Sequence, residues 1–201
     1  MQRCILGSQI FLNKEVITKV FSIIEKDILE TKVLFIPNEK VTLEKIESGK
    51  YVKRLEEWGF KKENIFVFDK DNADASKNLD IDAIIVSGGN TFGTMNNLRV
   101  SNFTNDIKNY VKNGVIYIGE SAGSHIASKN FKHVIKYDSN ECMMTNFEGL
   151  NLFDGIFICH FDESRREDFE NLKKESNCEV YALSNNEFID LKNGKITKYE
   201  V

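Results

Sequence analysis

The segment Gly119-Glu120-Ser121-Ala122-Gly123 has the pattern of a catalytic serine. The sequence G-x-S-x-G is typical of a sharp turn from a strand into a helix, which holds the serine hydroxyl exposed. The apolar run 115–118 predicts that strand, and residues 122–127 favour the helix. The Ala122 amide and the helix N-terminus would then face a developing oxyanion. The alternative is an ordinary strand–turn–helix junction without chemistry.

Serine is a weak nucleophile unless a neighbouring base removes its proton. His160 is the preferred base, because it follows the apolar run 155–159 and strand ends converge in a parallel sheet. His125 is the rival, but it lies four residues after Ser121 on the same predicted helix and would point along that helix. A packed histidine without chemistry is the alternative for His160.

A histidine base needs an acceptor that orients its ring, usually a carboxylate. Asp138 lies between Ser121 and His160 and is the first choice. Three other acids, Glu187, Asp162 and Asp154, remain open as alternatives.

A second oxyanion donor is expected from another loop at a strand end. The turn Ser87-Gly88-Gly89-Asn90-Thr91 fits, because paired glycines let a backbone N–H approach a ligand. A glycine-rich turn without a ligand is the alternative. Asn90 in this turn and Arg165 near His160 are candidates for substrate contact, since an arginine fork matches a carboxylate.

Short apolar strands alternate with helical patterns along the chain. Helices are predicted over 14–31, 42–58, 91–98, 102–113 and 164–175. Strands are predicted over 33–36, 65–68, 81–86, 115–118, 155–159, 179–183, 186–191 and 195–200, and 131–137 is a further strand candidate. This alternation predicts an α/β fold with a mostly parallel central sheet and helices on both faces, in one domain spanning 1–201.

The composition restricts the class of partner. The net charge of −4 argues against a nucleic acid or an anionic membrane as the partner. The chain shows neither an export signal nor about 18 consecutive apolar residues, so we expect a cytoplasmic protein. The four cysteines and three histidines lack metal-site spacing, so free thiols and no metal or organic cofactor are expected.

Three segments together resemble one known family. Gly88-Gly89-Asn90-Thr91-Phe92, the segment from Gly119 to His125, and Cys159-His160-Phe161 look like the α-aspartyl dipeptidase (peptidase E) and cyanophycinase family of serine peptidases. The resemblance implies a fold like that of class I glutamine amidotransferases, with a serine in place of their cysteine. It implies Ser121 as nucleophile, His160 as base, and the Gly89 and Ala122 amides as the oxyanion hole.

The same resemblance implies Asp138 as the acid when the family's spacing is counted back from His160. When that spacing is counted forward from Ser121, it misses Asp138 by two residues. The chain also departs from the dipeptidases at two places. A Pro-Glu-Gly segment of the family is matched by Leu183-Ser184-Asn185-Asn186-Glu187, so Asn185 stands where the family has a glutamate unless Glu187 substitutes. Cys159 stands where they have a proline, and aspartyl specificity is therefore not carried over.

These patterns predict a serine-type peptidase that hydrolyses short peptides through an acyl-enzyme on Ser121. Its partner would be a small peptide, and exposed strand edges are compatible with a homodimer. The alternatives are an esterase or amidase acting on a small metabolite, and a binding module that keeps the fold without the chemistry. Cys159 is a poor alternative nucleophile because no glycine-bounded elbow surrounds it.

Overall fold

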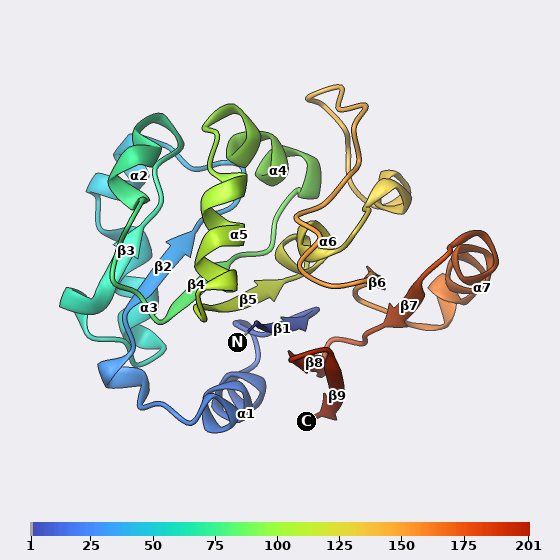
Figure 1. Cartoon of the computed structure of the whole chain (residues 1–201), viewed down its shortest axis with the longest axis horizontal. Helices are drawn as coiled ribbons and strands as arrows, with labels where there is room; N and C mark the ends of the chain where they lie inside the picture. Colours follow the sequence, from blue (N-terminus) through green and yellow to red (C-terminus); the bar gives the residue numbers. More distant parts are fainter. Residues whose placement is uncertain (1) are drawn as a thin grey trace.

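The computed structural model describes residues 2–201, which form a seven-stranded sheet and a separate two-stranded sheet (Figure 1). The large sheet has the order β3-β2-β4-β5-β1-β8-β9, and its first five strands are parallel. Its strands are β1 (Arg3–Gly7), β2 (Val33–Ile36), β3 (Ile65–Val67), β4 (Ala83–Val86), β5 (Ile116–Glu120), β8 (Glu187–Lys192) and β9 (Lys195–Glu200). The small sheet pairs β6 (Gly155–Ile158) with β7 (Glu179–Ala182) in parallel.

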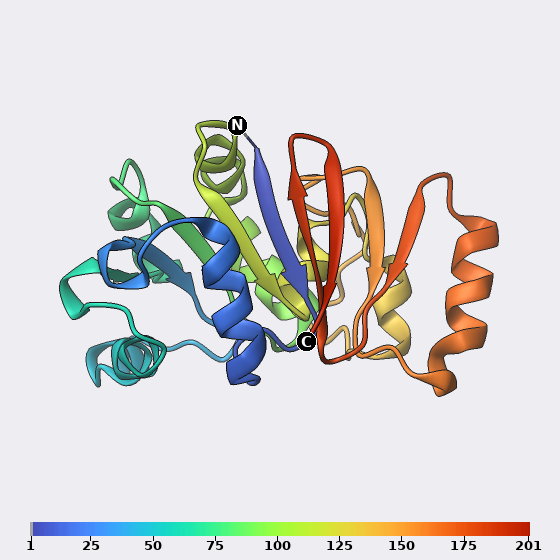
Figure 2. The same ribbon diagram turned by 90° about the horizontal axis from the view of Figure 1, so that it is seen from below.

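Helices cover both faces of the large sheet. On one face lie α1 (Lys14–Ile24), α2 (Leu43–Glu47) and α3 (Lys50–Glu57), and the core there is built from α1, α3 and the facing strand residues. On the other lie α4 (Thr91–Val100), α5 (Thr104–Lys112) and α6 (Ala122–Ala127). The helix α7 (Arg166–Glu175) stands beside the small sheet (Figure 2). The predicted fold class, a mostly parallel sheet with helices on both faces, is confirmed.

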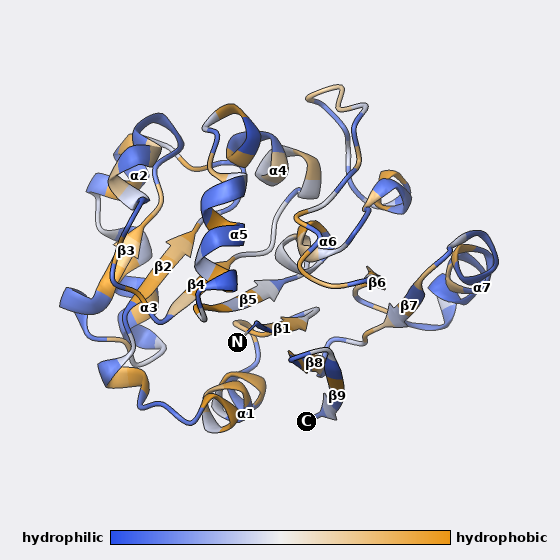
Figure 3. Cartoon of the chain, in the orientation of Figure 1, coloured by the Kyte–Doolittle hydropathy of each residue, from blue (hydrophilic) through white to orange (hydrophobic). Residues whose placement is uncertain are grey.

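Burial explains why the central strands read as unbroken apolar runs. Every residue of β1, β2 and β4 is buried, as expected for parallel strands with helices on both sides. Figure 3 shows the resulting contrast between apolar β2 and β4 and the polar α7, in which no residue is buried. The one charged residue in β1, Arg3, pairs with Asp190 of β8 through two hydrogen bonds of 2.9 and 2.8 Å.

Three predicted elements differ from the structure, and β1 was not predicted at all. The predicted helix 42–58 is divided into α2 and α3 at Gly49, whose φ of +71° interrupts the helical backbone. The helix predicted over 14–31 ends at Ile24, because Glu25 adopts a left-handed conformation. Residues 131–137 are not a strand but contain a 3₁₀ segment, Lys132–Lys136. The remaining 3₁₀ segments are Ile28–Glu30, Lys62–Asn64, Lys70–Ser76 and Glu163–Arg165.

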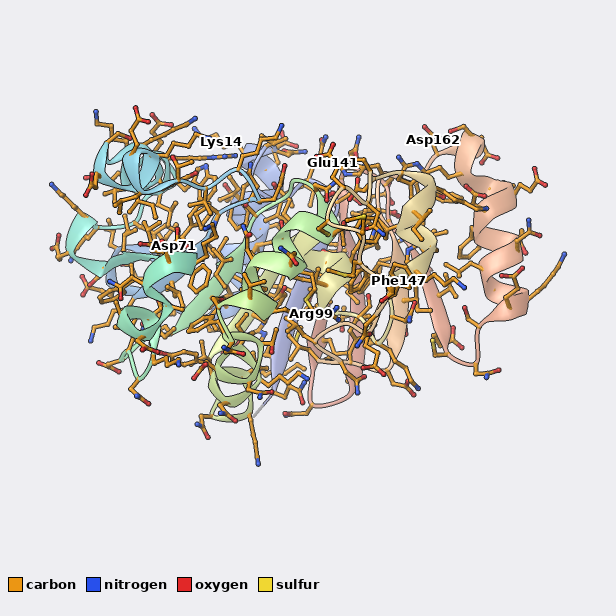
Figure 4. The ribbon with its side chains drawn as sticks, turned by 90° about the horizontal axis from the view of Figure 1, so that it is seen from above. Lys14, Asp71, Arg99, Glu141, Phe147 and Asp162 are labelled. Atoms are coloured by element: carbon orange, nitrogen blue, oxygen red, sulfur yellow. The ribbon has the colours of Figure 1, made fainter. Side chains whose placement is uncertain are left out.

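The loops that follow β1, β4, β5 and β6 meet at one edge of the molecule. In Figure 4, Lys14, Glu141 and Asp162 lie along this edge although they come from distant parts of the chain. The convergence follows from parallel strand direction, since carboxyl ends of parallel strands share one edge. None of the helices in residues 2–201 has the length and apolar character needed to cross a membrane.

Candidate active site

Ser121 sits on a strained turn between β5 and α6. Its φ of 48° and ψ of −105° are unusual for a residue with a side chain. The turn is tight enough to require both flanking glycines. A Cβ at Gly123 would lie 2.4 Å from the carbonyl oxygen of Val86, and a Cβ at Gly119 would lie 2.7 Å from Gly123. The G-x-S-x-G pattern is therefore a steric requirement of this elbow.

The end of β1 fixes the elbow in place. The Ser121 amide donates to the Gly7 carbonyl at 2.8 Å, and the Ser124 hydroxyl lies 2.9 Å from the same oxygen. The Ala122 amide is the first of helix α6, where an N–H has no acceptor in its own helix and is free to meet a ligand.

Ser121 and His160 lie within hydrogen-bond distance. Ser121 Oγ is 2.9 Å from His160 Nε2, and His160 Nδ1 is 2.7 Å from the side-chain oxygen of Asn185. An amide oxygen can only accept, so Nδ1 carries the proton and Nε2 is left as an acceptor for the serine hydroxyl. This tautomer is the one that a general base needs.

The backbone around His160 is anchored on both sides. The Ser8 hydroxyl accepts from the His160 amide at 2.9 Å and donates to Leu183 O at 2.7 Å. Arg165 Nη1 donates to Cys159 O at 2.6 Å, and its guanidinium stacks on Tyr137 at 4.2 Å. These contacts hold His160 in a left-handed conformation with φ of 53°, which turns its ring towards Ser121.

Asp138, the predicted orienting acid, makes a different contact. Its Oδ2 accepts from the Thr91 amide at 2.8 Å, at the N-terminus of α4, and the structure places Asn185 against His160 instead. The reason is positional: the loop after residue 136 crosses the start of α4, where unpaired helix amides attract a carboxylate. The three alternative acids also lie elsewhere. Glu187 accepts from the Ser184 amide and pairs with Lys198, Asp162 accepts from Ser164, and Asp154 pairs with Lys129.

The glycine turn after β4 leaves one amide available. The Gly88 backbone hydrogen-bonds the Glu120 carboxylate, the Asn90 amide donates to Glu39 at 2.8 Å, and the Thr91 amide donates to Asp138. Gly89 is left without an acceptor among the residues that the structure describes. Its φ of +146° disfavours any residue with a side chain.

Glu120 is a buried carboxyl beside Ser121. Its Oε2 accepts from the Phe11 amide at 2.5 Å, so it joins the loop after β1 to the glycine turn. Burial raises the pKa of Glu120, while the hydrogen bond from Phe11 and the charge of Arg54 oppose the rise. The carboxyl therefore holds two site loops together at the edge of the elbow.

A cavity of about 270 Å³ opens over these groups. It is lined by Ser8, Gln9, Leu12, Arg54, Ser87, Gly88, Gly89, Glu120, Ser121 and His160. Of the two predicted substrate contacts, Asn90 bonds Gly93 and Ser139, and Arg165 bonds Cys159, so both side chains are engaged within the protein. The cation that lines the cavity is Arg54, which the sequence patterns did not single out.

The cysteines offer no competing nucleophile at this cavity. Burial raises the pKa of the Cys159 thiol to about 12, which keeps it protonated at neutral pH. Residues 2–201 contain no group of three histidine, cysteine or acidic side chains placed to hold a metal ion.

Comparison with known proteins identifies the family of this chain. The model of peptidase family S51 matches residues 5–199. The chain belongs to peptidase family S51. The resemblance inferred from the three motifs is thereby confirmed, and the protein is a serine-type peptidase.

Named relatives agree with this assignment. An uncharacterized peptidase of Listeria monocytogenes is 29% identical over 190 residues, covering 90% of this chain and 91% of that protein. Peptidase E of a Nostoc species is 28% identical over 175 residues, covering 84% and 69%. The crystal structure of a proposed peptidase E from Listeria monocytogenes matches with a TM-score of 0.78 and 27% identity, covering 100% and 99% of the two chains.

Two further histidines of this S51 peptidase lie close together, His125 buried on the helix that follows the elbow and His133 half-buried beside it. His125 Nδ1 lies 3.3 Å from the Thr91 hydroxyl, away from Ser121, and its ring meets the His133 ring edge-on at 5.6 Å. His133 Nε2 lies 2.6 Å from the Phe157 carbonyl. Burial lowers the pKa of His133 to about 4 and that of His125 well below its usual value, so both stay neutral.

These histidines predict a loss of stability in acid. The unfolded chain takes up protons near pH 6.5, which the folded His133 accepts only near pH 4, so the free energy of unfolding falls as pH drops through this window. The slope per histidine is at most about 1.4 kcal/mol per pH unit. His133→Gln keeps a donor for Phe157 without titrating, so its unfolding in urea should lose less stability between pH 7 and pH 5 than the wild type. Equal losses in the two proteins would contradict this.

Proposed function

We propose that this S51 peptidase hydrolyses short peptides through an acyl-enzyme on Ser121. The observation that carries the proposal is the 2.9 Å contact between Ser121 Oγ and His160 Nε2 on a strained, glycine-bounded elbow. A serine hydroxyl paired with an unprotonated imidazole nitrogen is the arrangement that activates serine for acyl transfer.

The steps follow from the positions of these groups. Ser121 Oγ attacks the peptide carbonyl carbon while its proton passes to His160 Nε2. The Gly89 and Ala122 amides donate hydrogen bonds to the carbonyl oxygen as it becomes negatively charged, each such donor stabilising the transition state by roughly 2.7–4 kcal/mol. The imidazolium then protonates the leaving amine, the C–N bond breaks, and the acyl group stays on Ser121. Water, deprotonated by His160, attacks the ester and releases the carboxylic acid.

Asn185 gives this mechanism a neutral orienting group. Its amide oxygen fixes the tautomer and the ring orientation of His160, as a carboxylate does in other serine enzymes. It adds no full negative charge to stabilise the imidazolium. We therefore assign Asn185 as a positioning residue and place Asp138 and Glu39 in a structural role at the start of α4.

The size of the cavity favours small substrates. Its volume of about 270 Å³ is slightly below the range of roughly 300–1,000 Å³ that is usual for ligand sites. A cavity of that size accommodates one or two residues around the scissile bond. Short peptides rather than folded proteins fit this restriction.

A peptide panel tests the proposal. Di- to tetrapeptides with varied residues before the scissile bond, Asp-Xaa included, would be incubated with purified protein and product amines quantified. Ser121→Ala and His160→Ala should each lower kcat/KM at least about 1,000-fold, because both act in the same proton transfer. The matched control is Ser22→Ala, an exposed serine on α1, which should retain wild-type turnover. Turnover that survives in Ser121→Ala would rule the proposal out.

The neutral orienting group predicts a distinctive pH profile. In Asn185→Asp a carboxylate beside Nδ1 would favour the charged imidazolium. At a given acidic pH, more of the His160 rings would then be protonated and unable to accept the proton of Ser121. The acid limb of the kcat/KM profile should move to higher pH by about one unit in Asn185→Asp. Asn185→Ala should lower kcat without moving the acid limb to higher pH. A merely structural Asn185 would leave the limb in place in both variants, and that result would refute its assignment.

A further inference from the structure

The positive charge that forms on His160 has no carboxylate beside it. When the Ser121 proton moves to His160, the imidazole becomes an imidazolium, and the group next to its Nδ1 is the neutral amide of Asn185. The acids that the sequence offered as orienting groups make their contacts elsewhere. In serine enzymes with a triad, a carboxylate stabilises this imidazolium. A carboxylate placed elsewhere near His160 stabilises the same charge through space.

Glu120 lies in the position to do so. It directly precedes Ser121, and among residues 2–201 it is the one acid that lines the catalytic cavity together with Ser121 and His160. Its Oε1 and the Ser121 Cβ lie 3.3 and 3.5 Å from the point where a Cβ of Gly88 would stand, so both side chains pack against the same point of the glycine turn. Ser121 Oγ lies 2.9 Å from His160 Nε2. The carboxyl, the serine and the imidazole therefore surround one cavity.

The surroundings of Glu120 favour the ionised form of its carboxyl, although the residue is only 6% exposed. Its Oε2 accepts from the Phe11 amide at 2.5 Å, and the Gly88 backbone provides a second hydrogen bond. The charged groups that face it are Arg54 of α3 and His160 after β6. Burial raises the pKa of Glu120, while the two hydrogen bonds and these two charges oppose the rise. Amide donors and nearby cations bind a carboxylate more tightly than a carboxylic acid.

The interaction between Glu120 and His160 is mutual. The positive charge of protonated His160 favours the ionised carboxyl, so the carboxylate favours the protonated imidazole by the same free energy. The other titratable or charged groups near His160 do not supply this stabilisation. Arg165, which bonds Cys159 O, is positive, and His125 on α6 is buried and neutral. Because Glu120 is buried, its charge acts on His160 with little screening by salt.

We propose that the Glu120 carboxylate stabilises the imidazolium of His160 during acyl transfer, and so supplies from the elbow the negative charge that Asn185 lacks. The inference rests on the proposed function, because His160 is the base of that reaction. Glu120 acts through His160 and on no atom of the substrate, so it is a positioning residue. The part of a triad carboxylate is divided between two residues: Asn185 fixes the tautomer of His160, and Glu120 provides the charge.

The first test is the pH profile of kcat/KM on a peptide that the panel finds to be cleaved. Glu120→Gln keeps the size of the side chain but removes its charge, so the acid limb should move to lower pH by about 0.5–1 unit. At the plateau kcat should fall about three- to tenfold, because one pH unit equals a tenfold change in the stability of the imidazolium. Asp82→Asn is the matched control. The Asp82 carboxylate also accepts from a backbone amide, that of Lys32, but at the opposite end of β4, so this variant should keep the wild-type profile.

A compensating variant separates the charge of Glu120 from its loop contacts. In Glu120→Gln combined with Asn185→Asp, the carboxylate beside Nδ1 replaces the lost charge, so the acid limb should return to its wild-type position or above it and kcat should recover. A carboxyl that only ties two loops together would lower kcat in Glu120→Gln without moving the acid limb, and that result would overturn the proposal. A higher kcat in Glu120→Gln would overturn it too, because repulsion of the oxyanion would then outweigh the effect on His160.

The same interaction can be measured with Glu120 in place and without substrate. In protein carrying carbon-13 at its glutamate carboxyls, the NMR signal of Glu120 is assigned by its absence from Glu120→Asp. His160→Gln removes the positive charge that faces Glu120, so this signal should titrate at higher pH than in the wild type. An unchanged titration would refute the proposal even if Glu120→Gln does not fold. A failed peptide panel with a shifted titration would refute the proposed function, whereas an active panel with an unchanged titration would refute only the role of Glu120.

Discussion

The active-site geometry depends on how the end of β1 is tied to two segments from different sheets. Gly7 O accepts from the Ser121 amide, and the Ser8 hydroxyl accepts from the His160 amide. Ser121 follows a strand of the large sheet and His160 follows β6 of the small one, so two neighbouring residues fix the distance between Ser121 and His160. A shift of about 1 Å at either contact would separate a hydrogen-bonded pair, which is why such sites tolerate little movement.

Much of the fold follows from the sequence pattern, because buried parallel strands need apolar side chains on both faces. The runs at β2, β4 and β5 therefore predict the central strands and the class of sheet. β1 was missed because it contains Arg3, whose charge is neutralised by Asp190 more than 180 residues away. Without β1, the loop that carries Ser8 and Phe11 into the site could not be anticipated. Long-range partners of this kind leave no local signal.

The site was predictable to the extent that its chemistry is local. The elbow around Ser121 is a steric pattern within five residues, and His160 follows a strand directly. The group that orients His160 lies far from it in the sequence. The structure has the Asn185 amide beside Nδ1, where the sequence analysis expected a carboxylate. Because acidic residues are abundant in the chain, position alone favoured Asp138. The signal at position 185 was its match to the family's glutamate. Arg54 left no signal, because a charged helix face resembles solvent-exposed surface until the fold brings it to the cavity.

The most direct test is whether Ser121 is an activated nucleophile. The purified native protein would be treated with a fluorophosphonate at neutral pH, and the modified residue would be located by mass spectrometry. The mechanism predicts a single adduct on Ser121 that is lost in His160→Ala, because the imidazole is what activates the hydroxyl. An adduct on Ser121 that forms at the same rate without His160, or labelling at another serine of the folded protein, would contradict it.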